Sequence, residues 1–143
     1  GIFFGIRYFH TNDHFLRSVL EGICFTLKNI LEIIESAAVP VNQINVSGGF
    51  VHSQTWMQLL ADITGKELYI VQTEDASSIG AAMMGLKALK IINDYVVLNS
   101  DAAISINPNL ELYNDYKKYY EIFKTLYNPL KESMHQLQKI ETQ

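Results

Sequence analysis

The chain has 143 residues, 48% of them hydrophobic and 18% charged, so it is long enough for one globular core and too short to presume two. Its formal net charge of −4 argues against a nucleic-acid binder, because neutralising phosphates requires clustered Lys and Arg, and here these residues are scattered. A single cysteine excludes an internal disulfide framework, and without an apolar run of about 20 residues or a signal-peptide pattern we expect no membrane contact and a cytoplasmic location.

The first predicted element is a long helix. The chain begins with the apolar and aromatic run "GIFFGIRYF", which is typical of the interior of a domain. We therefore expect the chain to be a fragment. Thr11, Asn12 and Asp13 are N-cap candidates for a helix of roughly 24 residues that ends before Pro40, in which Cys24 should be buried. The predicted apolar face comprises Leu16, Leu20, Ile23, Leu27, Ile30 and Ile34. Two charged pairs one turn apart are expected to be ordinary exposed ion pairs: Arg17 with Glu21, and Lys28 with Glu32.

A strand, a glycine turn and a second helix follow. Residues 43–47 alternate into a short strand that breaks at Gly48 and Gly49. Ser53 is the predicted N-cap of the next helix, and Gly65 stands where a left-handed C-cap residue belongs. The apolar face of that helix is predicted to be Trp56, Leu59, Leu60 and Ile63.

A second strand and a third helix complete the alternation. Residues 66–72 are predicted to be a strand and residues 74–90 a helix, with Asp75, Ser77 or Ser78 as its N-cap. Strands that alternate with helices at this spacing imply crossovers onto one parallel sheet, so the fold class is α/β. The small residues of "SSIGAAMMG" suit close helix packing or the close approach of a ligand.

The remainder is predicted to be one irregular stretch and one long helix. Residues 93–109 lack periodicity, and apolar residues at helical spacing begin near Leu110. Pro129 should kink or interrupt that helix near Asn128. The tyrosines of this segment are expected to be packing residues rather than a stacking platform for bases.

The glycine pair is the most informative feature for chemistry. At the carboxyl end of a parallel strand, a turn without Cβ atoms leaves backbone N–H groups and a helix N-terminus open to a ligand such as a nucleotide. A tight turn with no ligand would also explain the pair. Neither a Walker-type loop nor a GxGxxG fingerprint is present in the sequence.

Other candidate groups offer less. The cap sequence should place His10 outside the helix that contains His14, so the two need not share a face, and we expect no metal site. Nothing resembles a nucleophile elbow. Asp62 lies near a helix C-terminus, where a carboxylate opposes the helix dipole, so we expect a compensating partner for it.

Three separated blocks resemble the C-terminal region of the FGGY carbohydrate kinases, in that family's order and spacing. They read "GIFFGIRYFHTNDHFLRSVLEGICFTL", "VSGGFVHSQTWMQLLADITGKELYIV" and "DASSIGAAMMGLKAL". The residues of these blocks are most similar to those of gluconokinase-like members, with xylulokinase-like members next. The resemblance implies the later part of an actin/ribonuclease-H-like kinase domain, with short parallel strands, packed helices and a long C-terminal helix.

The resemblance also implies roles for particular residues. Gly48 and Gly49 would lie against the adenosine and phosphates of ATP, and Ser53 would contribute beside the adenine. Phe50 stands where some members carry a third glycine, and we count it among the expected nucleotide-binding residues. Gly80 and Ala81 would be walls of the same nucleotide pocket.

What the chain lacks is implied too. The phosphate loops, the general-base aspartate and most sugar-binding residues of the family belong to earlier sequence, so residues 1–143 are expected to be a partial, nucleotide-side C-terminal domain without its own catalytic residue. The expected parent is an ATP- and Mg²⁺-dependent kinase of a sugar or sugar acid, gluconate first and xylulose or another pentulose second. A non-catalytic, actin-like nucleotide-binding or interaction module is the other reading. Missing sheet strands should leave part of the apolar surface exposed at Phe3, Phe4 and the long-helix faces, so a homo-oligomer is expected.

Overall fold

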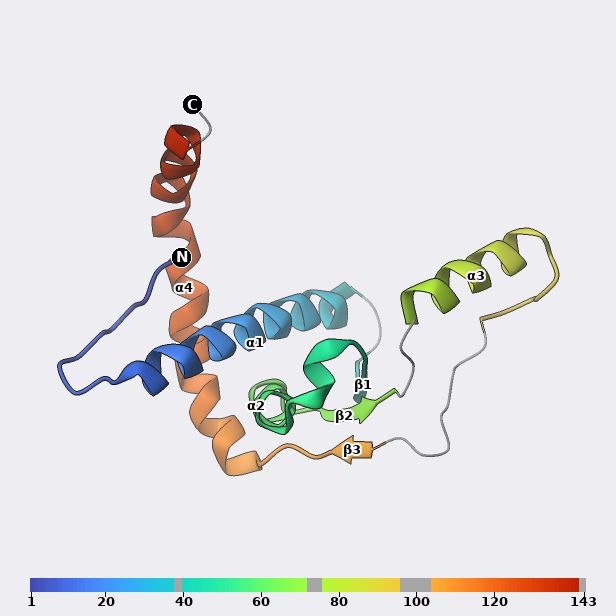
Figure 1. The fold of residues 1–143 in the computed structure, drawn as a ribbon, viewed down its shortest axis with the longest axis horizontal. Helices are drawn as coiled ribbons and strands as arrows, with labels where there is room; N and C mark the ends of the chain where they lie inside the picture. The colour runs from blue at the N-terminus through green and yellow to red at the C-terminus, as the bar shows by residue number, and fades with distance from the viewer. Residues whose placement is uncertain (38–39, 72–75, 96–103, 142–143) are drawn as a thin grey trace.

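The structure, a computed structural model, describes residues 1–37, 40–71, 76–95 and 104–141 (Figure 1). The elements follow in the order α1 (Asn12–Ala37), β1 (Gln43–Val46), the 3-10 helix η1 (Gly49–His52), α2 (Gln54–Thr64), β2 (Glu67–Ile70), α3 (Ala76–Ala88), β3 (Ile104–Ile106) and α4 (Leu110–Glu141). The predicted α/β class is confirmed, together with the long first and last helices.

One sheet with strand order β1-β2-β3 lies at the centre. The predicted parallel pair is confirmed, because β1 and β2 run parallel with Val46 opposite Ile70. The prediction that residues 93–109 are irregular is wrong for β3, which pairs antiparallel with β2 and sets Ile104 opposite Ile70. Three residues are too few for the alternation of a strand to show in the sequence. The apolar pairs that β3 forms with β2 stabilise it as a strand instead.

Helix α2 supplies more of the buried apolar core than any other element. Its residues Met57 and Ile63 are fully buried, as are Leu68 of β2 and Tyr120 of α4. Both predicted caps are confirmed. The Ser53 Oγ accepts a hydrogen bond from the backbone N–H of Trp56 at 3.3 Å, and Gly65 adopts the left-handed conformation with φ +70°.

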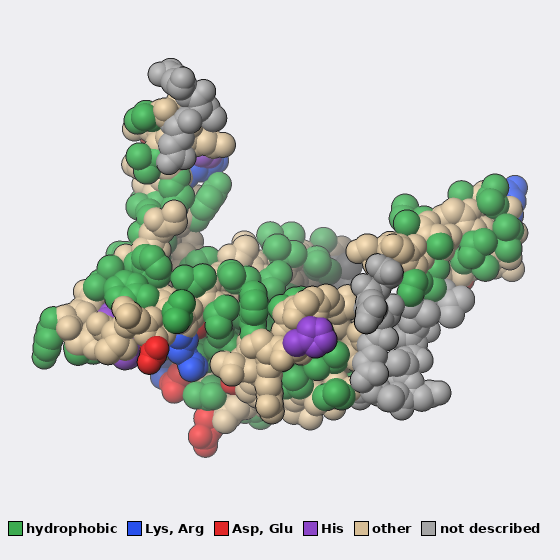
Figure 2. Space-filling view, viewed as in Figure 1, with side chains coloured by type: hydrophobic (Ala, Val, Ile, Leu, Met, Phe, Trp, Pro, Cys, Tyr) green, Lys and Arg blue, Asp and Glu red, His purple; other side chains and the backbone are tan. Residues whose placement is uncertain are grey.

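Helix α1 buries a different face from the one its apolar stripe predicts. Its buried residues are Cys24, Phe25 and Lys28, which confirms the burial of the cysteine. Most of the predicted apolar face is exposed instead, as are Phe3 and Phe4 in the preceding segment. The expectation of exposed apolar surface at these places is therefore confirmed, and Figure 2 shows hydrophobic side chains gathered over α1.

Helix α4 runs through Pro129 without a break, so the predicted interruption near Asn128 is wrong, whereas the alternative of a kink stays a prediction. A proline removes one backbone hydrogen bond, and the rest of a helix of 32 residues remains to carry it. Tyr116 and Tyr120 are buried packing residues, as predicted.

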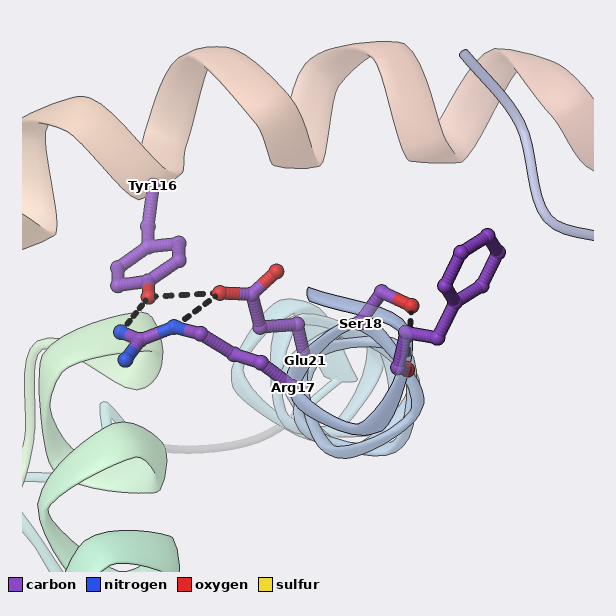
Figure 3. Close-up of polar contacts among 5 residues, drawn as sticks. Arg17, Ser18, Glu21 and Tyr116 are labelled. Atoms are coloured by element: carbon purple, nitrogen blue, oxygen red, sulfur yellow. Dashed lines mark hydrogen bonds and ion pairs between the residues drawn. The ribbon is translucent and has the colours of Figure 1, made fainter. Parts of the chain in front are cut away.

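A hydrogen-bonded cluster joins α4 to α1 (Figure 3). The Tyr116 hydroxyl donates to Glu21 Oε1 at 2.9 Å and accepts from the Arg17 guanidinium at 2.8 Å. The predicted pair of Arg17 and Glu21 is confirmed, with a separation of 2.9 Å. Its hydrogen bonds to Tyr116 and Glu21 raise the pKa of Arg17.

Helix α3 begins at Ala76, so Ser77 and Ser78 lie inside it and neither is its N-cap. The third candidate, Asp75, lies outside the described residues. Across the part of the chain that the structure describes, no helix combines the length and the apolar character that a membrane span requires.

Candidate functional site

The turn after β1 contains two glycines in different backbone conformations. Gly48 has φ +98° and ψ 179°, a combination that essentially only glycine adopts. Gly49 opens η1 without a positive φ, and a Cβ built there would meet nothing within 4 Å. The local backbone therefore explains Gly48, whereas neither strain nor crowding in this fold explains Gly49.

Backbone hydrogen bonds and one ring contact connect the turn to α2. The Val51 N–H donates to the Gly48 carbonyl at 3.2 Å, and the Ser53 N–H donates to the Phe50 carbonyl at 3.1 Å. The Phe50 ring is half-buried and lies 5.6 Å from the Trp56 ring, centroid to centroid. The structure thus brings Gly48, Gly49, Phe50 and Ser53 together in one short segment at the carboxyl end of β1.

A cavity of about 440 Å³ lies beside this turn. Its walls come from η1, the start of α2, the last residue of β2 and the segment around β3: Val51, His52, Gln54, Met57, Gln58, Ile70, Ile104, Ser105, Ile106 and Asn107. Ligands of open α/β sheets bind outside the carboxyl ends of the strands, which is where this cavity lies. The sequence reasoning missed it because it did not find β3, which is too short to give a signal of its own and is defined by its pairing with β2.

Gly80 and Ala81 lie on α3, and the structure does not bring them to the turn. In Figure 1, α3 stands to one side of the sheet and of α2, and Gly80 and Ala81 are exposed. A Cβ at Gly80 would meet nothing within 4 Å. Their role as pocket walls stays a prediction.

Two buried charged side chains lie at the other end of α2. Lys28 is 5% exposed, and its Nζ donates to the Ile63 carbonyl at 2.7 Å. The predicted exposed pair of Lys28 with Glu32 is therefore wrong, and Glu32 lies 3.7 Å from Lys124 instead. Burial lowers the pKa of the Lys28 ammonium.

The predicted partner of Asp62 is confirmed and identified. Asp62 is 4% exposed, and its Oδ1 accepts from the backbone N–H of Asn109 and from Gln58 Nε2, both at 2.8 Å. Hydrogen bonds from neutral donors thus satisfy a carboxylate that the helix dipole disfavours.

The histidines near the start of α1 serve its local structure. His10 lies outside the helix, as predicted, and its ring stacks on that of His14 at 5.2 Å between centroids. The His14 Nδ1 accepts from the Thr11 N–H at 3.1 Å, and Thr11 is the residue before the first helical one. Within the described ranges, no three His, Cys, Asp or Glu side chains stand close enough to hold a metal ion.

Most of the chain matches a family of known proteins. Residues 1–89 match the FGGY family of carbohydrate kinases, C-terminal domain. A probable L-xylulose kinase of Haemophilus influenzae is 35% identical over 123 residues, which cover 85% of this chain and 25% of that protein. A gluconokinase of Bacillus licheniformis is 32% identical over 141 residues, which cover 96% of this chain and 27% of that protein.

Solved structures share the fold. The ligand-bound xylulose kinase of Lactobacillus acidophilus superposes with a TM-score of 0.75 at 23% identity, over 95% of this chain and 28% of that one. The gluconate kinase of the same organism gives 0.71 at 24% identity, over 90% of this chain and 27% of that one. This chain thus spans about a quarter of the length of these relatives. From the match of residues 1–89 and the two identities above 30%, the chain belongs to the FGGY family of carbohydrate kinases.

Proposed function

We propose that residues 1–143 form the nucleotide-side part of the C-terminal domain of an ATP-dependent carbohydrate kinase. The parent enzyme transfers the γ-phosphate of ATP to a hydroxyl of a sugar or sugar acid. The observation that carries the proposal is Gly49, a glycine at the carboxyl end of a parallel strand with open space around it and no positive φ. Space that the protein itself does not fill suits the close approach of a nucleotide to the backbone.

Each residue of the turn has a distinct part in this proposal. Gly48 turns the chain in a conformation reserved for glycine, and Gly49 leaves room for the nucleotide beside the backbone. Phe50 anchors the turn on Trp56, and Ser53 starts α2 with its exposed hydroxyl next to the adenine. Gly80 and Ala81 complete the pocket from α3.

Phosphoryl transfer depends mainly on positioning and on stabilisation of charge, with Mg²⁺ neutralising the phosphates. Among the described residues, no three His, Cys, Asp or Glu side chains form a group that could hold a metal ion, and we derive no step through Mg²⁺ for this chain. The general base, the phosphate loops and the metal ligands belong to the rest of the parent enzyme. This chain binds one side of the nucleotide and does not catalyse phosphoryl transfer from it.

Gluconate is the proposed substrate, and xylulose or another pentulose is the alternative. Support comes from the gluconokinase of Bacillus licheniformis and from the probable L-xylulose kinase of Haemophilus influenzae, whose identities to this chain, 32% and 35%, do not separate them. A phosphorylation screen of the full-length enzyme with gluconate, D-xylulose and L-xylulose decides the substrate. Turnover of gluconate at least tenfold above the pentuloses supports the first choice, and the reverse order replaces it.

The proposal for this chain is tested by titrating it with ATP while recording amide NMR spectra. Shifts of Gly48, Gly49 and Ser53, together with no ATPase or gluconate phosphorylation in a coupled assay, are the expected result. Robust turnover by residues 1–143 would refute the proposal that this chain binds the nucleotide while the rest of the parent enzyme supplies the catalytic groups. Spectra in which these amides do not respond to ATP would refute the nucleotide site and leave a non-catalytic interaction module.

We further propose that the chain forms a homo-oligomer through an apolar face on α1 and the segment before it. Large side chains of this face are between 40% and 69% exposed: Ile2, Phe3, Phe4, Ile6, Phe9, Leu16, Val19, Ile23, Leu27, Ile30, Ile33 and Ile34. Together they present on the order of 1,000 Å², which is what one partner of a standard interface buries. A dimer mass in light scattering is expected, and a monomer at high concentration would refute the proposal.

Cys24, a buried free thiol, suits a cytoplasmic location for this enzyme.

A further inference from the structure

Helix α2 is fixed at the end remote from the glycine turn. Lys28 reaches from α1 to the Ile63 carbonyl in its last turn, and Asp62 in the same turn accepts from the N–H of Asn109, which precedes α4. The two charges have opposite signs, and each is satisfied by a backbone group rather than by the other. Together they tie one end of α2 to α1 and to the start of α4.

The surroundings of Lys28 make this contact directional. Its Nζ lies over the rings of Tyr113 and Tyr120, 4.6 and 4.9 Å from their centroids, and it points at a helix C-terminus, where a cation is favoured. An apolar side chain of similar length would avoid the desolvation of a buried ammonium and is often as stable in such a place. The effect of the lysine on the orientation of α2 is therefore clearer than its effect on the stability of the fold.

The glycine turn lies at the opposite end of the same rigid element. An α-helix of 11 residues is about 16 Å long, so a tilt of about 5° at the anchored end displaces the other end by roughly 1 Å. The start of α2 is connected to the turn through Ser53, whose N–H is bonded to the Phe50 carbonyl. A change in the direction of α2 is thus passed to the turn without an intervening flexible segment.

We propose that Lys28 is a positioning residue that sets the direction of α2 and, through it, the place of the Gly48–Ser53 turn. Its effect on ATP rests on the proposed function, whereas its effect on the direction of α2 does not. Misplacement of binding groups by about 1 Å can reduce the efficiency of a site by up to ~100-fold.

The test compares Lys28→Met with the control Tyr116→Phe in the 143-residue chain. Tyr116 joins α1 to α4 as well, but both hydrogen bonds of its hydroxyl go to α1, to Arg17 and Glu21. Residual dipolar couplings of the α2 amides measure the direction of α2 relative to α1, and ATP titration gives the dissociation constant. We expect changed α2 couplings and an ATP dissociation constant raised about tenfold for Lys28→Met, with both restored by Lys28→Arg and both unchanged in Tyr116→Phe.

The outcomes separate the two proposals. Unchanged α2 couplings in Lys28→Met, or equal changes in Tyr116→Phe, overturn the positioning role. Changed couplings with a wild-type chain that does not bind ATP support the positioning role and refute the nucleotide site. If Lys28→Met does not fold, the same couplings are measured in Lys28→Gln, and unchanged α2 couplings in that variant overturn the proposal.

Discussion

Replacing Gly65 by alanine tests how tightly α2 is closed against α4. Gly65 ends α2 with φ +70°, and a Cβ built on it would lie 2.6 Å from Cε2 of Tyr113. The left-handed conformation costs a non-glycine residue about 1 to 2 kcal/mol, and forcing a methyl group into a filled site costs roughly 1 to 3 kcal/mol. We therefore expect Gly65→Ala to lower the free energy of unfolding by roughly 2 to 5 kcal/mol.

The assay is urea unfolding followed by circular dichroism, with Gly22→Ala as the control. Gly22 lies inside α1, where a Cβ would meet nothing within 4 Å, so alanine there should stabilise the chain by roughly 0.5 to 1 kcal/mol. The double variant Gly65→Ala with Tyr113→Ala removes the overlap but not the backbone strain. Its loss of unfolding free energy should therefore be smaller than the sum of the losses in the two single variants. A loss below about 0.5 kcal/mol for Gly65→Ala, or strict additivity in the double variant, would refute the reasoning.

Two further predictions concern the cap of α2 and the buried thiol. Ser53→Ala removes the acceptor for the Trp56 N–H and should cost about 1 kcal/mol of stability in the same urea assay, with Ser53→Asp near wild type; an unchanged midpoint would contradict the capping role. Burial raises the pKa of the Cys24 thiol to about 11 from an ordinary value of 9.0, so between these pH values the folded chain keeps a proton that the unfolded chain loses. Stability should therefore fall from pH 9 to pH 11 by about 2 kcal/mol more in the wild type than in Cys24→Ala, and parallel pH profiles of the two would show that the thiol does not contribute.

Local signals in the sequence were sufficient for the elements around the turn. The alternation of residues 43–47, the capping hydroxyl of Ser53 and the terminal Gly65 depend on neighbours within a few residues, and the structure confirms all three. That Asp62 needs a partner was also predictable from the helix dipole. Of its two partners, Gln58 lies one helical turn away and within reach of a local pattern, whereas Asn109 lies 47 residues further along the chain and is beyond it.

The errors arose where tertiary packing decides. Lys28 fits an exposed ion pair by spacing, but the arrival of α4 buries it against Tyr113 and Tyr120. The apolar stripe of α1 resembles a core face, whereas the core takes Cys24 and Phe25. For the candidate site, the glycine turn was predictable, but the cavity beside it requires β3, which only its pairing with β2 defines.

Gly49→Ala gives the most direct test that the turn makes room for a nucleotide. The backbone there has no positive φ and the added methyl group would meet nothing in the protein, so the free energy of unfolding should stay the same or rise by up to ~1 kcal/mol. ATP titration of the wild type and the variant under identical conditions is the measurement. We expect the variant to bind ATP at least about tenfold more weakly, a loss of about 1.4 kcal/mol of binding free energy. Equal ATP affinity in the two proteins would show that Gly49 makes no room for a nucleotide and would contradict the account.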